Sequence, residues 1–150
     1  NLYYGDPFLQ VANTLNILRR LYENKHTGPV IIITKGILKK ELLTQISNFD
    51  LDIHFAFSTF GIDSLKYDIN SKDSLLRNLD TISNTQIKRS IEFRPICYGI
   101  NDSKEIIEDV FKIANRYDVA IGYSGLRGKP ETQEYWKKNN LSYNQISLIV

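Results

Sequence analysis

The sequence predicts an α/β domain built on parallel strands. Apolar residues recur alternately at the spacing of a strand and at the spacing of a helix, and turn-forming residues such as Gly28-Pro29 separate the segments. This strict alternation of strand and helix favours a parallel sheet with right-handed crossovers, which is either open or curled into a barrel.

The expected strands are short and apolar. Val30–Ile33 is a run of β-branched residues, which is typical of a buried strand. Short extended or alternating apolar segments predict the others. In chain order, the expected strands are Leu2–Tyr4, Val30–Ile33, Leu51–Phe57, Ile91–Pro95 and Val119–Tyr123.

The expected helices carry apolar residues three or four positions apart, which places them on one face. Leu38, Leu42 and Ile46 form one such set. Asp102 and Glu105 form a pair like a capping box before the fourth helix. In chain order, the expected helices cover residues 11–22, 38–46, 75–82, 106–114 and 131–138.

Two of the strands are apolar on one face only. The apolar residues of Leu51–Phe57 share one face, whereas His54 and Ser58 share the other. In the next strand, Glu92 and Arg94 alternate with apolar residues in the same way. An open, doubly wound sheet carries helices on both faces and needs apolar residues on both. The pattern therefore predicts a barrel with outer helices, whose polar inner face lines a cavity.

Composition limits the class of function. A length of 150 residues suits one domain, so we expect a single domain over residues 1–150. The net charge of +2 gives no nucleic-acid signature, and no apolar run approaches the roughly 20 residues of a membrane span. The single cysteine, Cys97, fits a reducing, cytoplasmic location. The chain lacks methionine and has apolar ends, so we expect a fragment of a longer protein.

Folds of this type bind ligands at the C-terminal ends of their strands. Glycine there allows close approach of the backbone, hydroxyl groups can bind a ribose, and Lys35 and Arg94 can bind a carboxylate. Arg94 is expected to face the interior beside Ser58, or else to pair with Glu92. Regular strand pairing is expected to stop at Pro95, where the chain opens into the loop of Tyr98-Gly99. The expected cofactor-binding residues at the strand ends are Gly5, Asp6, Pro7, Thr34, Lys35, Ser58, Arg94 and Ser124.

Other chemistries find little support in the sequence. His26 and His54 lack the spacing of metal ligands, and no P-loop, G-x-S-x-G or G-x-G-x-x-G motif occurs. His54 is expected to be a satisfied interior histidine. We therefore assign neither a catalytic residue nor a metal ligand.

The order of several short motifs resembles radical SAM proteins of the spore photoproduct lyase-like group. Gly5-Asp6-Pro7-Phe8 is followed by a helix and by a strand that ends in Thr34-Lys35. Phe55-Ala56-Phe57-Ser58-Thr59 is similar to the next strand of the family, and residues 94–102 to its Pro-Ile…Gly-x-Asn-Asp segment. The resemblance covers about residues 1–125. It implies a partial TIM barrel of six βα units, of which this chain contains five.

The resemblance also implies an activity and a set of binding roles. Such enzymes use a [4Fe–4S] cluster to cleave S-adenosylmethionine reductively to a 5′-deoxyadenosyl radical. By resemblance, Gly5-Asp6-Pro7 holds the methionine amino group, Ser58 and Arg94 contact its carboxylate or the ribose, and Ile100 flanks the adenine. The family's Cys-x3-Cys-x2-Cys motif is absent. The cluster ligands are therefore expected upstream of this chain, and the chain alone is expected to be inactive.

Two alternatives remain open. One is a non-catalytic, degenerate barrel that binds a nucleotide without a cluster. The other is a barrel lyase in which Lys35 forms a Schiff base with a carbonyl substrate. The substrate is not defined, because no feature of the sequence favours DNA over a peptide or a small molecule.

Overall fold

The computed structural model describes residues 5–62, 72–97 and 99–125. Helices and strands alternate along this part of the chain, as the sequence predicts. The expected strand at Leu2–Tyr4 and the expected helix over 131–138 lie outside the described residues. The elements are α1 (Val11–Glu23), β1 (Val30–Thr34), α2 (Lys40–Ser47), β2 (Ile53–Thr59), α3 (Lys72–Ile82), β3 (Lys88–Ile96), α4 (Lys104–Tyr117) and β4 (Ala120–Gly125).

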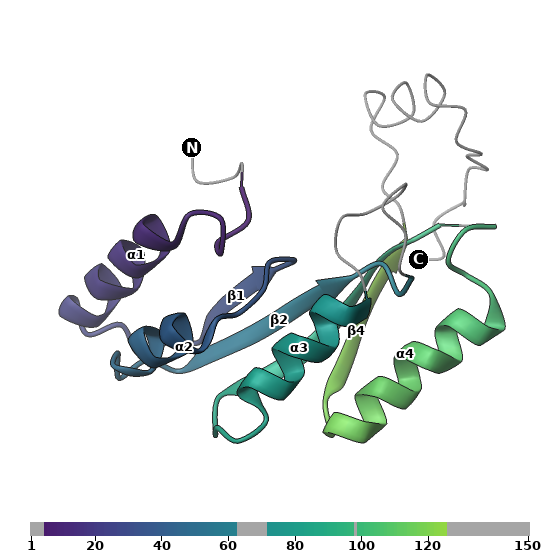
Figure 1. Ribbon diagram of the computed structural model, residues 1–150. Helices are drawn as coiled ribbons and strands as arrows, with labels where there is room; N and C mark the ends of the chain where they lie inside the picture. Colours follow the sequence, from purple (N-terminus) through teal and green to yellow (C-terminus); the bar gives the residue numbers. More distant parts are fainter. Residues whose placement is uncertain (1–4, 63–71, 98, 126–150) are drawn as a thin grey trace.

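The four strands form one all-parallel sheet in the order β1-β2-β3-β4 (Figure 1). The prediction of a parallel α/β sheet is confirmed. Each strand lies beside its predecessor in the chain, so the strand order never reverses. Because parallel crossovers are right-handed, a sheet that grows in one direction carries its helices on one face.

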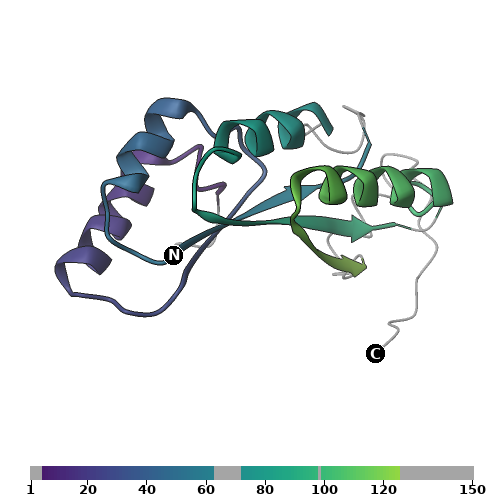
Figure 2. The same cartoon turned by 90° about the horizontal axis from the view of Figure 1, so that it is seen from below.

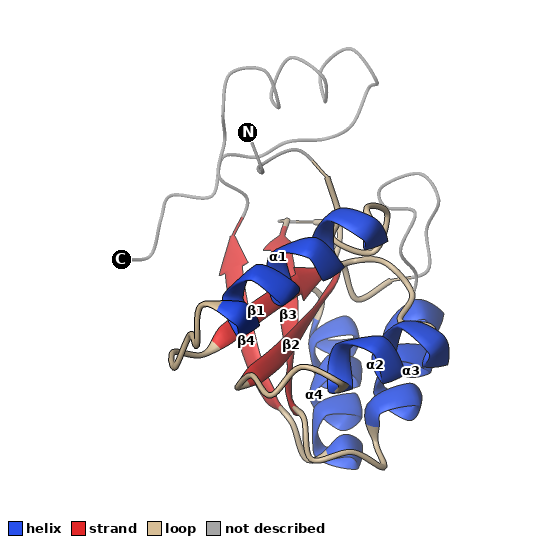
Figure 3. Cartoon of the chain, turned by 90° about the vertical axis from the view of Figure 1, so that its left-hand side faces the viewer, coloured by secondary structure: helices blue, strands red, loops and turns tan. Residues whose placement is uncertain are grey.

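Helices α2, α3 and α4 lie together on one side of the strands (Figures 2 and 3). The core between helices and sheet is built on side chains from this face. Phe55 stacks on Phe57 with ring centroids 5.8 Å apart, and Phe8 meets Phe55 edge-on at 6.0 Å. Leu79 and Ile91 are completely buried in the same cluster. Helix α1 packs beside α2 and adds the buried Leu18.

The opposite face, here called the open face, carries the other set of strand residues. The register pairs Ile31 with His54 and Ser58 with Glu92, which puts these residues on the same face. His54 and Ser58 share this face with Glu92, as predicted. Ile31 retains 58% of its accessible surface, so helices do not cover this face at β1.

Strand β3 becomes irregular near its end. Its pairing with β4 is regular up to Phe93, shifts register, and resumes at Ile96, which pairs with Gly125. The Arg94–Pro95 peptide bond is cis. We predicted that regular pairing stops at Pro95. Regular pairing does end before Pro95, although the strand resumes for one residue at Ile96. Pro95 cannot donate a ladder hydrogen bond, and the strand accommodates it by the register shift.

The N-terminus of α4 is capped one residue later than predicted. Ser103 is the cap, and its hydroxyl accepts a hydrogen bond of 3.4 Å from the Ile106 N–H. Asp102 instead accepts a 2.7 Å hydrogen bond from the Gly99 N–H and closes the preceding turn. Both residues are good cap formers. Because the Asp102 side chain is used to close the turn at Gly99, Ser103 is the one that caps the helix.

None of the helices in the described ranges is long and apolar enough to cross a membrane.

Candidate functional site

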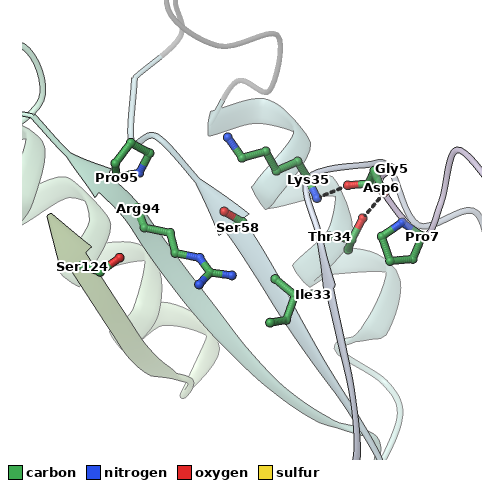
Figure 4. Close-up of a pocket in the computed structure, with 10 residues that line it drawn as sticks. All are labelled: Gly5, Asp6, Pro7, Ile33, Thr34, Lys35, Ser58, Arg94, Pro95 and Ser124. Carbon is green, nitrogen blue, oxygen red and sulfur yellow. Dashed lines mark hydrogen bonds between the residues drawn. The ribbon is translucent and has the colours of Figure 1, made fainter. Parts of the chain in front are cut away.

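A cavity of about 330 Å³ lies at the C-terminal end of the sheet (Figure 4). This volume is in the range of small-molecule sites. Ile33 and Pro95, which the sequence analysis did not select, also line it. The predicted cofactor-binding residues that line the cavity are Gly5, Asp6, Pro7, Thr34, Lys35, Ser58, Arg94 and Ser124.

The carboxylate of Asp6 is occupied by hydrogen bonds within the chain. One oxygen accepts from the Phe8 N–H at 2.8 Å and from the Thr34 hydroxyl at 2.6 Å. The other accepts from the N–H groups of Lys35 and Gly36. A carboxylate has about four lone-pair positions, and all of them are used here. Asp6 thus fastens the segment before α1 to the end of β1, and the Thr34 hydroxyl is used in the same network.

A buried side-chain amide on α3 holds the loop that follows β1. Asn78 is 2% exposed; its side-chain oxygen accepts from the Leu38 N–H at 2.7 Å, and its amide group donates to the Gly36 carbonyl at 2.9 Å. Gly36 has no room for a side chain, because a Cβ there would lie 2.8 Å from the Cβ of Phe8. The loop after β1 is therefore fixed from two sides.

A second buried amide holds the ends of β2 and β3. Asn101 is fully buried, and its oxygen accepts from the Cys97 N–H at 2.6 Å. Its amide group donates to the carbonyls of Phe60 and Pro95, each at 2.9 Å. The Gly-x-Asn-Asp segment thus contains a structural residue that the sequence analysis did not single out.

Arg94 presents its guanidinium group to the cavity, on the same side as Ser58 (Figure 4). The predicted position of Arg94 on the same side as Ser58 is confirmed. The side chain is 36% exposed, and its only polar contact in the described part of the chain is an ion pair of 3.8 Å from Nε to Glu92. The hydroxyls of Ser58 and Ser124 also have no hydrogen-bond partner among the described residues.

Lys35 and Ile100 differ in their relation to the cavity. Lys35 lines it, and its side chain extends toward the upper left in Figure 4, above Ser58. Ile100 is not among the lining residues; its N–H donates to the Cys97 carbonyl at 3.1 Å within a turn. Its predicted contact with an adenine stays a prediction.

The other candidate groups are engaged in the fold. His54 Nε2 lies 3.0 Å from the Ser90 hydroxyl on the open face, so this histidine has a partner, as expected. Cys97 is 4% exposed, and burial, followed by the charge of Asp102, raises the pKa of its thiol to about 11. Among the described residues, no group of three or more histidine, cysteine and acidic side chains could hold a metal ion.

The helical pattern of the sequence indicates one of the two buried amides, Asn78, but not the other, Asn101. Asn78 lies among Leu75, Leu79 and Ile82 on the apolar face of its helix, where a polar residue needs a partner. Asn101 is in an irregular segment, and no periodicity distinguishes it from a surface turn residue.

We compared the chain with models of protein families, with curated protein sequences and with solved structures, and none of the three comparisons gave a match. The function is therefore inferred from the site itself.

Proposed function

We propose that this cavity binds S-adenosylmethionine, and that the chain is the cofactor-binding core of a radical SAM enzyme. One observation carries the proposal: three groups whose hydrogen-bond donors have no hydrogen-bond partner among the described residues line one cavity at the C-terminal ends of parallel strands. They are the Arg94 guanidinium and the hydroxyls of Ser58 and Ser124. Unpaired donors on a partly buried surface favour a ligand that supplies acceptors.

We further propose that the sheet is part of a barrel of the TIM type. The sequential strand order and the helices on one face support this. So does the open face, where β2 and β3 carry His54, Ser58 and Glu92 in place of the apolar residues that a second helix layer would need. In a barrel, this face is the interior and the cavity lies at its mouth.

Three parts of the ligand find suitable groups: the carboxylate, the ribose and the base. The Arg94 fork can bind a carboxylate through two parallel hydrogen bonds. The two serine hydroxyls can bind the ribose, and Ile33 offers an apolar surface to the base. Bound S-adenosylmethionine would supply the adenosyl group for radical chemistry, and the protein would orient it.

The chain does not contain the ligands of a [4Fe–4S] cluster. Such clusters are held by cysteine thiolates, and the one cysteine of this chain is buried with a raised pKa. Cys97 therefore does not fit the role, and we derive no reductive step from this chain. If the full protein is an enzyme, the cluster ligands come from another segment, and this chain by itself binds without turnover.

The test is titration calorimetry of the chain with S-adenosylmethionine. We expect saturable binding, and we expect Arg94→Ala to weaken it by about 1.5–3 kcal/mol, the range for hydrogen bonds to charged groups. Arg77→Ala is the matched control, because Arg77 is exposed on α3 and outside the cavity lining. It should leave the affinity unchanged.

Melting curves on the same variants separate binding from structure. If Arg94 only pairs with Glu92, Arg94→Ala lowers the melting temperature while the affinity stays the same. Absence of saturable binding by the unmodified chain would contradict the proposed function.

The non-catalytic alternative is favoured by the same cysteine observation. It predicts that a longer natural chain also lacks the three cysteines and that its nucleotide binding survives removal of iron. Cleavage of S-adenosylmethionine by an iron-loaded, longer chain would contradict it.

A further inference from the structure

A separate cavity of about 280 Å³ lies between helices α1 and α2, which are neighbours in Figure 1. It shares no lining residue with the cavity at the end of the sheet. Buried and half-buried apolar side chains form its floor, and exposed charged and amide side chains form its rim. The lining residues are Phe8, Val11, Ile37, Lys39, Glu41, Leu42 and Gln45.

Large apolar side chains are exposed at this cavity. Leu9 retains 79% of its accessible surface, and in the chain it lies between two lining residues, Phe8 and Val11. Ile37, which itself lines the cavity, retains 46%. A single exposed apolar residue is ordinary on a protein surface, but here two of them accompany an apolar pocket. One surface thus carries both a projecting apolar side chain and a pocket that is large enough to receive one.

The charges on the rim are not used within the described part of the chain. Lys39 and Glu41 are exposed at the start of α2, and neither side chain makes an ion pair or a hydrogen bond there. A rim with one cation and one anion favours neither an acidic nor a basic partner. It is complementary to a surface that presents the same two charges in the opposite order. A second copy of the chain, turned about a two-fold axis, presents that order.

We propose that this surface, which consists of the cavity lining and Leu9 and is called the α1–α2 surface below, binds a second copy of the chain about a two-fold axis. Leu9 of each copy enters the cavity of the other, and Lys39 of each copy pairs with Glu41 of the other. Every contact in such an interface occurs twice, so the dimer buries two leucines and forms two sets of ion pairs. The inference goes beyond the proposed function and does not depend on it, because the two cavities share no residue.

The expected dimer is reversible. Specific, stable interfaces bury about 1,200–2,000 Å² in total, and a patch built on one pocket and its rim belongs at the lower end of this range. Association is therefore measured over a series of concentrations by sedimentation equilibrium. The mass of one chain is 17.4 kDa, and we expect the apparent mass to rise toward twice this value as the concentration increases.

Leu9→Asp tests the apolar contact. Because Leu9 is exposed in the single chain, the substitution leaves the core of the monomer intact. It should weaken the dimer about tenfold or more, since each dimer loses two buried leucine side chains. Phe111→Asp is the matched control. Phe111 is also a large exposed apolar residue, but it is on α4 and outside the cavity lining, so its substitution should leave the dissociation constant unchanged.

Two charge variants test the two-fold axis. Lys39→Glu leaves two acidic residues on the rim, and Glu41→Lys leaves two basic ones, so each variant repels a second copy of itself and should dimerise less. An equimolar mixture of the two variants brings opposite rims together and should restore association as a mixed dimer. A chain with both substitutions should dimerise like the unmodified chain. A folding defect in either variant would not produce this rescue.

Two results would overturn the proposal. If the unmodified chain stays at 17.4 kDa throughout the series, the cavity has another occupant, such as a small apolar molecule or a different protein. If a dimer forms but neither Leu9→Asp nor the two charge variants weaken it, the interface is elsewhere on the chain. Both results leave the proposed function untouched, because they concern residues outside the cavity at the end of the sheet.

Discussion

At the scale of single residues, the two carboxylates near the cavity differ in what they have left to bind. Asp6 is saturated by a hydroxyl and three backbone N–H groups, so it positions the wall of the cavity. Glu92 has one distant ion-pair partner in the described part of the chain. Two acidic residues of one chain therefore differ in role: Asp6 is a structural clamp, whereas Glu92 makes one long ion pair with Arg94.

Cys97 is predicted to be unreactive in the folded protein. Burial raises the pKa of its thiol to about 11, and only the thiolate is a nucleophile or metal ligand. We expect slow alkylation by iodoacetamide at pH 8 in the native state and rapid alkylation in urea, measured by mass spectrometry. Because the raised pKa favours the neutral thiol in the folded state, stability should fall as the pH rises from about 9 to 11. Rapid native-state alkylation at pH 8 would contradict the burial of this thiol.

The sequence was informative about which residues surround the cavity and uninformative about what they contact. Position at the end of a parallel strand selected Ser58, Arg94 and Ser124 correctly as lining residues. The saturation of Asp6 depends on partners 28 to 30 positions away, which no local pattern reveals. The sequence pattern places Glu92 on the polar face of its strand, but it does not show which group the carboxylate contacts.

At the scale of elements, helix α3 links the core to the site. Leu75 and Leu79 bury its apolar face, and Asn78 extends from the same face to the loop after β1. One helix thus contributes both packing energy and the position of the cavity wall.

Removal of the Asn78 side chain should be costly. In Asn78→Ala, the Leu38 N–H and the Gly36 carbonyl lose their partners, and each unsatisfied buried group costs about 1–3 kcal/mol. We expect a loss of about 2–4 kcal/mol in the free energy of unfolding, measured by urea denaturation. Asn115→Ala, on the exposed side of α4, is the control and should cost less than about 1 kcal/mol. A small effect of Asn78→Ala would show that the loop does not depend on this clamp.

Helix positions followed from periodicity, but their ends did not. The spacing of Leu38 and Leu42 predicts that both lie in the second helix, but Leu38 precedes α2 and is buried in the hydrophobic core. Its backbone N–H is satisfied by Asn78, which replaces the helical hydrogen bond. Tertiary contacts of this kind determine where a helix begins, and they are absent from a local pattern.

At the scale of the whole molecule, the alternation of elements predicted a parallel α/β sheet, and that prediction is confirmed. Closure into a barrel stays a proposal, because it depends on strands beyond the four described here. The polar open face favours a barrel, since it leaves the His54–Ser90 contact and the Glu92–Arg94 pair on the side without helices.

Amide hydrogen exchange can test the barrel at its two edges. The Val30 N–H donates to the Asp52 carbonyl of the β2 side, so by alternation the N–H groups of Ile31 and Ile33 point away from β2. In a flat sheet of four strands, two sets of amides have no strand partner and exchange rapidly: those of Ile31 and Ile33, and the outward amides of β4, whose N–H groups point away from β3. In the proposed barrel, a further strand lies beside β1 and accepts from Ile31 and Ile33. We therefore expect slow exchange at Ile31 and Ile33 and fast exchange at the outward amides of β4. Equally fast exchange at both edges would contradict the barrel, because no fifth strand would then extend the sheet beyond β1.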